Sequence, residues 1–122
     1  PHGVACGIVT LYQLDYNFVA AMDKLAHLAW YMGVDVSGLS VREAAVKCLE
    51  AVKTLLEDVE LPLSLQELDV PKEDMPKLAE YIVKERQFYY LLPEYNPRKL
   101  TVENVTELFE RMWEGRPKYI KI

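Results

Sequence analysis

Residues 40–59 read SVREAAVKCLEAVKTLLEDV, and this stretch decides the fold class. Ser40 and Glu43 have the Ser-x-x-Glu spacing of a capping box, in which each side chain bonds the other residue's backbone at a helix start. The following apolar residues recur at intervals of three and four, as on one helix face: Val41, Ala44, Ala45, Cys48, Val52, Leu55, Leu56 and Val59. Pro62 cannot continue the helix. The stretch therefore predicts a long amphipathic helix.

Similar patterns extend toward the N-terminus. Apolar spacing predicts helices over about 4–16 and 20–32, and Gly33 is placed to end the second of them with a positive φ. A β-strand is the competing interpretation of the first segment, because residues 7–10 (Gly-Ile-Val-Thr) suit extended structure, but the length of the pattern favours a helix. The buried face of the second helix is expected to contain Met22, Leu25, Leu28, Ala29 and Met32.

A short helical turn and a fourth helix are expected after the long helix. Ser64 and Glu67 repeat the capping-box spacing and predict a short helical turn through Leu68. A fourth helix is expected from about Pro71, with an apolar face made of Met75, Leu78, Ala79, Ile82 and Val83. Residues 87–99 contain two prolines and indicate an extended loop anchored by aromatic side chains.

The last helix has a clear beginning and end. Thr101 is a suitable N-cap, and Gly115 followed by Pro117 ends the helix. Together these segments predict five helices of about 11–19 residues, an all-α helical bundle.

Composition narrows the function. The 122 residues are 51% hydrophobic and 27% charged, as in a globular protein, with a net charge of −5. A nucleic-acid-binding protein would usually present a basic face, and the only local basic cluster is the tail (Arg116, Lys118 and Lys121), which we interpret as a solvated end. No apolar run approaches the roughly 18 residues that a membrane span needs.

The cysteines indicate a reducing compartment. Cys6 and Cys48 are far apart in the sequence, form no Cys-x-x-Cys pair, and fall in apolar helical patterns where a free cysteine acts as a small hydrophobe. No basic, apolar signal segment precedes the first helix, so we expect a cytoplasmic protein. The chain starts at Pro1, which indicates either a removed Met or the middle of a larger protein.

Several segments, in order, resemble the iron-containing (group III) alcohol dehydrogenases. They are Pro1-His2-Gly3, the Tyr16-Asn17 pair, residues 24–35 ending in Met-Gly-Val-Asp, residues 38–45, residues 65–70 (Leu-Gln-Glu-Leu-Asp-Val) and residues 96–101 (Asn-Pro-Arg-Lys-Leu-Thr). Asp69 stands where that family usually has Gly. The resemblance covers almost the whole chain and implies its C-terminal helical domain, the dehydroquinate synthase-like helical fold, without the N-terminal nucleotide-binding domain.

By this resemblance, the complete enzyme transfers a hydride between NAD(P) and an alcohol or aldehyde. Its helical domain holds a divalent metal, Fe²⁺ or Zn²⁺, through one Asp and three His, and the Pro-His-Gly motif makes His2 the last of these ligands. A neutral imidazole suits either ion. Because a stable site needs three or four ligands, we expect the isolated 122-residue chain to bind neither metal nor NAD(P) and to be inactive.

Other candidate site residues have simpler interpretations. Asp23 and His27 have i, i+4 spacing, but they follow the Pro-His-Gly motif instead of preceding it, so we interpret them as a paired surface couple and not as ligands. The aromatic candidates for a pocket are Tyr89, Tyr90, Tyr95 and Trp113, each also suited to anchoring the core. By resemblance, Tyr12 or Phe18 could reach a substrate.

Two alternatives stay open. The chain could be a stand-alone, non-catalytic helical module for interaction or assembly, since its apolar faces exceed what a small bundle needs. It could also derive from a relative on the same fold, such as glycerol dehydrogenase or dehydroquinate synthase, although residues 96–101 favour the alcohol dehydrogenase branch.

Overall fold

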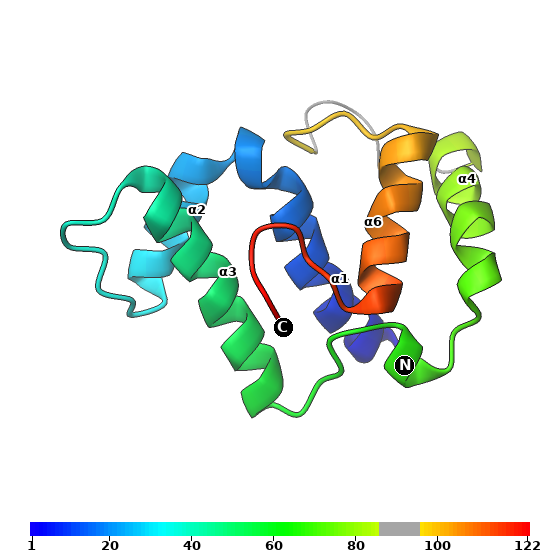
Figure 1. The fold of residues 1–122 in the computed structure, drawn as a ribbon, viewed down its shortest axis with the longest axis horizontal. Coiled ribbons are helices and arrows are strands. Elements are labelled where there is room, and N and C mark those ends of the chain that lie inside the picture. Colours follow the sequence, from blue (N-terminus) through cyan, green and yellow to red (C-terminus); the bar gives the residue numbers. More distant parts are fainter. Residues whose placement is uncertain (86–95) are drawn as a thin grey trace.

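The computed structural model describes residues 1–85 and 96–122, and within these ranges it contains five α-helices and no strand (Figure 1). The α-helices are α1 (His2–Asn17), α2 (Met22–Tyr31), α3 (Val41–Asp58), α4 (Met75–Glu85) and α6 (Val102–Glu114). Three short 3₁₀ turns connect them: η1 (Phe18–Ala20), η2 (Gln66–Leu68) and η3 (Lys72–Asp74). The predicted all-α fold is confirmed.

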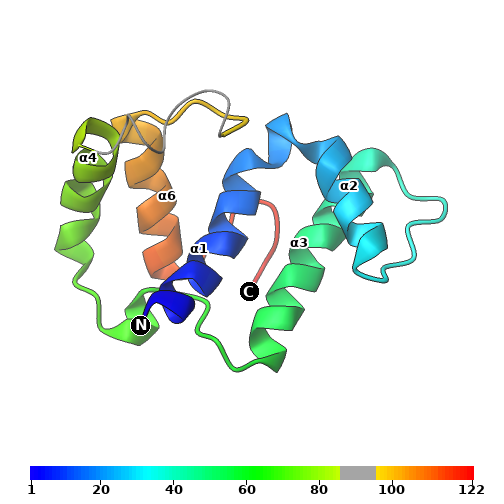
Figure 2. The ribbon, with the colours of Figure 1, turned by 180° about the vertical axis from the view of Figure 1, so that it is seen from behind.

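Helix α1 lies at the centre, with α2 and α3 on one side and α4 and α6 on the other (Figures 1 and 2). Ile8, Leu11, Tyr12 and Tyr16 are buried along one face of α1, at the spacing of a helix. This burial explains why the β-favouring residues 7–10 are helical, and the strand interpretation is wrong.

Helix α3 begins at the predicted capping box. The Ser40 hydroxyl accepts from the Glu43 N–H at 3.1 Å, and the Glu43 carboxylate accepts from the Ser40 N–H at 3.0 Å. The buried face is narrower than the sequence pattern suggests. Several predicted members of the apolar faces of α2, α3 and α4 are exposed: Leu28, Val41, Leu55, Val59 and Leu78. Of these, Leu28 was expected to be buried, and that prediction is wrong, because the packed helices cover only the centre of each apolar stripe.

Helix ends mostly lie where the turn residues predict them. Gly33 has φ 86° after α2, and Gly115 has φ 69° after α6, the left-handed conformation that favours glycine. Helix α2 begins two residues later than predicted, because residues 18–20 form η1. The predicted loop over 87–99 falls mostly outside the described residues.

The C-terminal segment folds back between α1 and α3 (Figures 1 and 2). Ile120 joins the core, and the ring of Tyr119 stacks on Phe18 with centroids 4.1 Å apart. The charged side chains of Arg116, Lys118 and Lys121 are exposed, as expected of a solvated end, whereas the apolar residues of this segment pack against the core. Tyr119 and Ile120, which lie between the basic residues and which a count of charges does not consider, hold the segment in place.

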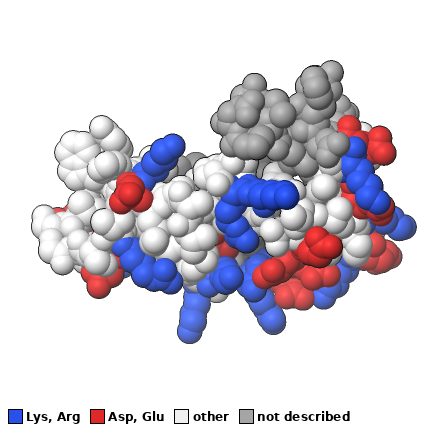
Figure 3. All heavy atoms as spheres, turned by 90° about the horizontal axis from the view of Figure 1, so that it is seen from above, with Lys and Arg blue, Asp and Glu red and all other residues white. Residues whose placement is uncertain are grey.

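Charged side chains are distributed unevenly over the surface. Seen from above, the end of the molecule formed by α2 and the following turn is largely uncharged (Figure 3). Trp30 and Tyr31 lie on this helix with 61% and 77% of their surface exposed, and their rings meet edge to face at 5.0 Å. No helix in the described ranges has the length and apolar character needed to cross a membrane.

Candidate functional site

His2 is the first residue of α1, and its side chain is exposed. Its Nε2 lies 3.3 Å from the Sγ of Cys6, one helical turn further along the same face. The imidazole therefore projects from the exposed first turn of α1, where ligands from outside this chain can approach it.

The described residues do not assemble a set of metal ligands. Among residues 1–85 and 96–122, no group of three or more His, Cys, Asp or Glu side chains is placed to hold a metal ion. His2 fits as a single ligand, because an exposed imidazole offers a ring nitrogen to Fe²⁺ or Zn²⁺. A Cβ at Gly3 would meet nothing within 4 Å, so the space beside His2 is open in this chain.

Asp23 and His27 do not form the predicted surface pair. Both side chains are exposed on α2, and they share no hydrogen bond or ion pair. The i, i+4 spacing places them on one side of the helix but does not bring their polar atoms together.

The aromatic candidates are mostly structural. Tyr12 and Phe18 are fully buried, and Tyr12 donates from its hydroxyl to the Leu63 carbonyl at 2.7 Å, so the expectation that either reaches a substrate is wrong. Trp113 donates from its indole N–H to the Val70 carbonyl at 2.7 Å and so anchors α6 to the segment before α4. Tyr89, Tyr90 and Tyr95 lie outside the described residues.

A buried carboxylate that the sequence analysis did not select holds the tail. Asp15 is 3% exposed, and its two oxygens accept the backbone N–H groups of Lys118 at 2.7 Å and Tyr119 at 2.9 Å. Burial raises the pKa of Asp15, against the lowering effect of these bonds and of the nearby Arg111 and Lys118 cations. A lone Asp on the buried face of an apolar helix is the signal that would have found it.

Comparison with known proteins agrees with the geometry. Residues 1–113 match the model of the Fe-containing alcohol dehydrogenase family, C-terminal part. The chain is 36% identical over 113 residues to lactaldehyde reductase of Escherichia coli K12 and 32% identical over 111 residues to 1,3-propanediol dehydrogenase of Citrobacter freundii. These matches cover 93% and 91% of the chain but only 28% and 27% of the relatives.

Solved structures give the same result. A crystal structure of 1,3-propanediol oxidoreductase superposes with a TM-score of 0.81 at 32% identity, and an alcohol dehydrogenase from Oenococcus oeni with a TM-score of 0.81 at 35% identity. Each match covers 93% of this chain and 28% of the solved chain. The chain thus spans just over a quarter of its relatives, and it belongs to the C-terminal part of the iron-containing alcohol dehydrogenase family.

Proposed function

We propose that this chain provides the C-terminal helical part of an NAD(P)-dependent alcohol dehydrogenase, which interconverts a small alcohol and its aldehyde. The observation that carries the proposal is the family match over residues 1–113, which begins at the Pro-His-Gly segment. Relatives named for lactaldehyde and 1,3-propanediol support a small hydroxylated substrate.

In this proposal, His2 is one ligand of a divalent metal, Fe²⁺ or Zn²⁺, whose other ligands lie outside the 122 residues. When bound, such an ion supplies Lewis-acid polarisation of an alcohol or carbonyl oxygen. His2 contributes a neutral imidazole nitrogen from the first turn of α1, a helix whose packed part begins at Ile8. The NAD(P)-binding residues are likewise expected in a nucleotide-binding domain outside this chain.

The first experiment is the intact mass of the native protein, captured from its source cells with an antibody to this chain. A mass several times 14.1 kDa supports the proposal, and a mass near 14.1 kDa overturns it. The captured protein is then assayed for bound metal and for NAD(P)-dependent oxidation of 1,3-propanediol.

Two histidines allow a matched test of the ligand. We expect His2→Ala to remove most of the bound metal, measured by elemental analysis of the purified protein. His27→Ala removes the other, exposed imidazole and is expected to leave metal content unchanged. Equal metal content in the two variants would show that His2 is not a ligand.

A second candidate function is a non-catalytic interaction module, favoured by the exposed Trp30 and Tyr31 on α2, at an end of the molecule with few charged side chains. It predicts that the intact chain has a mass near 14.1 kDa and that copies of this chain associate with one another. Light scattering after size-exclusion chromatography measures this directly, and a strictly monomeric chain argues against the module.

A further inference from the structure

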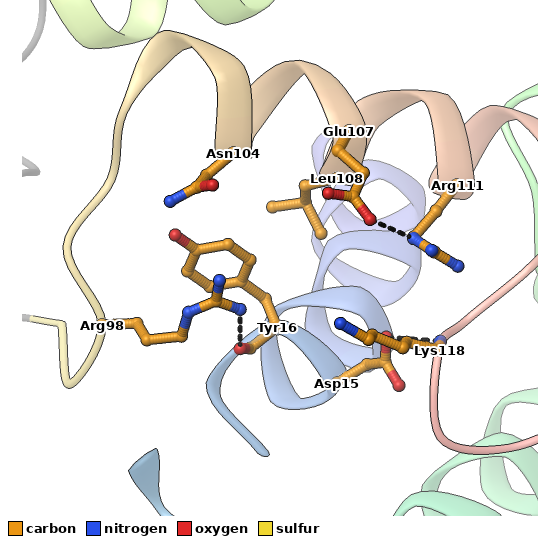
Figure 4. A pocket seen from close by; sticks show the side chains of 8 residues that line it. All are labelled: Asp15, Tyr16, Arg98, Asn104, Glu107, Leu108, Arg111 and Lys118. Carbon is orange, nitrogen blue, oxygen red and sulfur yellow. Dashed lines mark hydrogen bonds and ion pairs between the residues drawn. The ribbon is translucent and has the colours of Figure 1, made fainter. Parts of the chain in front are cut away.

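A polar pocket lies where the end of α1, the turn before α6, α6 itself and the C-terminal segment meet (Figure 4). Three of its residues are cations and two are carboxylates. The lining residues are Asp15, Tyr16, Arg98, Asn104, Glu107, Leu108, Arg111 and Lys118. The pocket therefore carries a formal charge of about +1 in a molecule whose net charge is −5.

The two carboxylates already have partners. Glu107 pairs with the Arg111 Nε at 2.9 Å, and Asp15 accepts the backbone N–H groups of residues 118 and 119. Neither carboxylate forms an ion pair with Arg98 or Lys118. Within the part of the chain that the structure describes, neither cation is in an ion pair, although Lys118 lies near enough to Asp15 to act on its pKa.

Arg98 is held in a fixed orientation. Its Nη1 donates to the Tyr16 carbonyl at 2.8 Å, and its guanidinium lies over the Tyr16 ring, 4.0 Å from the centroid. These contacts occupy one nitrogen and one face, so the remaining N–H groups are available to an acceptor.

Lys118 approaches the same space from the C-terminal segment. Its backbone is fixed by Asp15, and its ammonium lies 5.8 Å from the Tyr119 ring and makes no hydrogen bond to a protein acceptor in the described ranges. Figure 4 shows the Lys118 ammonium and the Arg98 guanidinium directed toward one another across the pocket. Two facing cations repel unless an anion lies between them.

We propose that this pocket binds a small oxyanion, a phosphate or a carboxylate, between the Arg98 guanidinium and the Lys118 ammonium. Arg98 presents a preorganised donor edge of the kind that matches planar or tetrahedral oxyanions, and Lys118 adds a point charge. The Asn104 amide, on the α6 side, is a further donor within the lining. The family model matches residues 1–113, so Lys118 is a pocket residue that the family model does not include.

The test is a titration of the protein with inorganic phosphate, followed by NMR of the Arg98 Nε–H and the Lys118 backbone N–H, at constant ionic strength. Saturable shifts at these two groups, absent from the exposed Arg116, support the site. Shifts that rise linearly, or equally at Arg98 and Arg116, overturn it. A parallel titration with acetate distinguishes phosphate from carboxylate as the preferred group.

Matched lysine variants separate the pocket from general surface charge. Lys118→Met removes the ammonium and keeps the backbone N–H that Asp15 accepts, so the fold is preserved. We expect it to weaken phosphate binding by about two- to fivefold. Lys121→Met removes an equally exposed tail charge outside the lining and should leave affinity unchanged. Equal weakening by both variants overturns the proposal, and neither result depends on metal binding at His2.

Discussion

Replacing Asp15 with Asn tests the contact that closes the fold. The carboxylate accepts two backbone N–H groups, at 2.7 and 2.9 Å, with its two oxygens. An Asn amide has one oxygen, so one acceptor is lost and the remaining bond becomes neutral. One backbone N–H is then left facing the Asn NH₂ group without an acceptor. Leaving such a donor unsatisfied costs about 1–3 kcal/mol, so we expect a loss of about 2 kcal/mol.

The assay is urea unfolding at pH 7, followed by far-ultraviolet circular dichroism. In a thermal melt, the same loss of stability would lower the melting temperature of a chain of this length by about 8 °C. Asp58→Asn is the matched control, because Asp58 is exposed at the end of α3, and it should change stability by less than about 0.5 kcal/mol. If the free energy of unfolding of Asp15→Asn also differs from that of the wild type by less than about 0.5 kcal/mol, Asp15 does not hold the C-terminal segment.

The pH dependence of the stability of the wild type and of Asp15→Asn gives an independent check. Because burial raises the folded-state pKa of Asp15, the folded protein binds this proton more tightly than the unfolded chain does. The associated stabilisation is complete below the ordinary carboxyl pKa and is lost as pH rises through the raised value. The stability difference between wild type and Asp15→Asn should therefore be larger at pH 4 than at pH 7. A difference that grows toward pH 7 would contradict this assignment.

Three further substitutions test separate parts of the fold by the same unfolding measurement. Ser40→Ala removes one half of the capping box and should cost about 1 kcal/mol; no change would mean that α3 does not depend on its cap. Tyr12→Phe leaves the buried Leu63 carbonyl without its donor and should cost about 1–2 kcal/mol; unchanged stability would mean that this bond does not contribute. Gly115→Ala should cost about 1–2 kcal/mol, because φ is 69° and the new Cβ would lie 3.3 Å from the Ser64 Cβ; unchanged stability would exclude strain there.

Local signals in the sequence predicted the helices well. Ser40 with Glu43, Thr101, Gly33 and Gly115 determine helix ends through bonds and backbone angles within a few residues, so no tertiary information is needed. Burial was predicted less well. Leu55 repeats at the right interval but is 52% exposed, because periodicity shows which face is apolar and not how much of it a neighbour covers.

The sequence pattern does not predict polar contacts between residues that are far apart in the chain. Asp15 and Lys118 are 103 positions apart, and Arg98 meets Tyr16 across 82 positions. Neither pairing has a local signature, so the pocket between α1 and α6 was not anticipated. His2 was selected through family resemblance alone, and its role as a ligand stays a prediction.

The two tryptophans lie on opposite sides of α1, Trp30 on α2 and Trp113 on α6 (Figure 1). Trp30 is 61% exposed, whereas the indole N–H of Trp113 is bonded to the Val70 carbonyl. Their emission should therefore differ in wavelength and in quenching by acrylamide, with Trp30 redder and more readily quenched. A single-tryptophan variant of each kind would give a separate optical probe for each half, and would show whether the α2–α3 and α4–α6 halves melt together or in sequence.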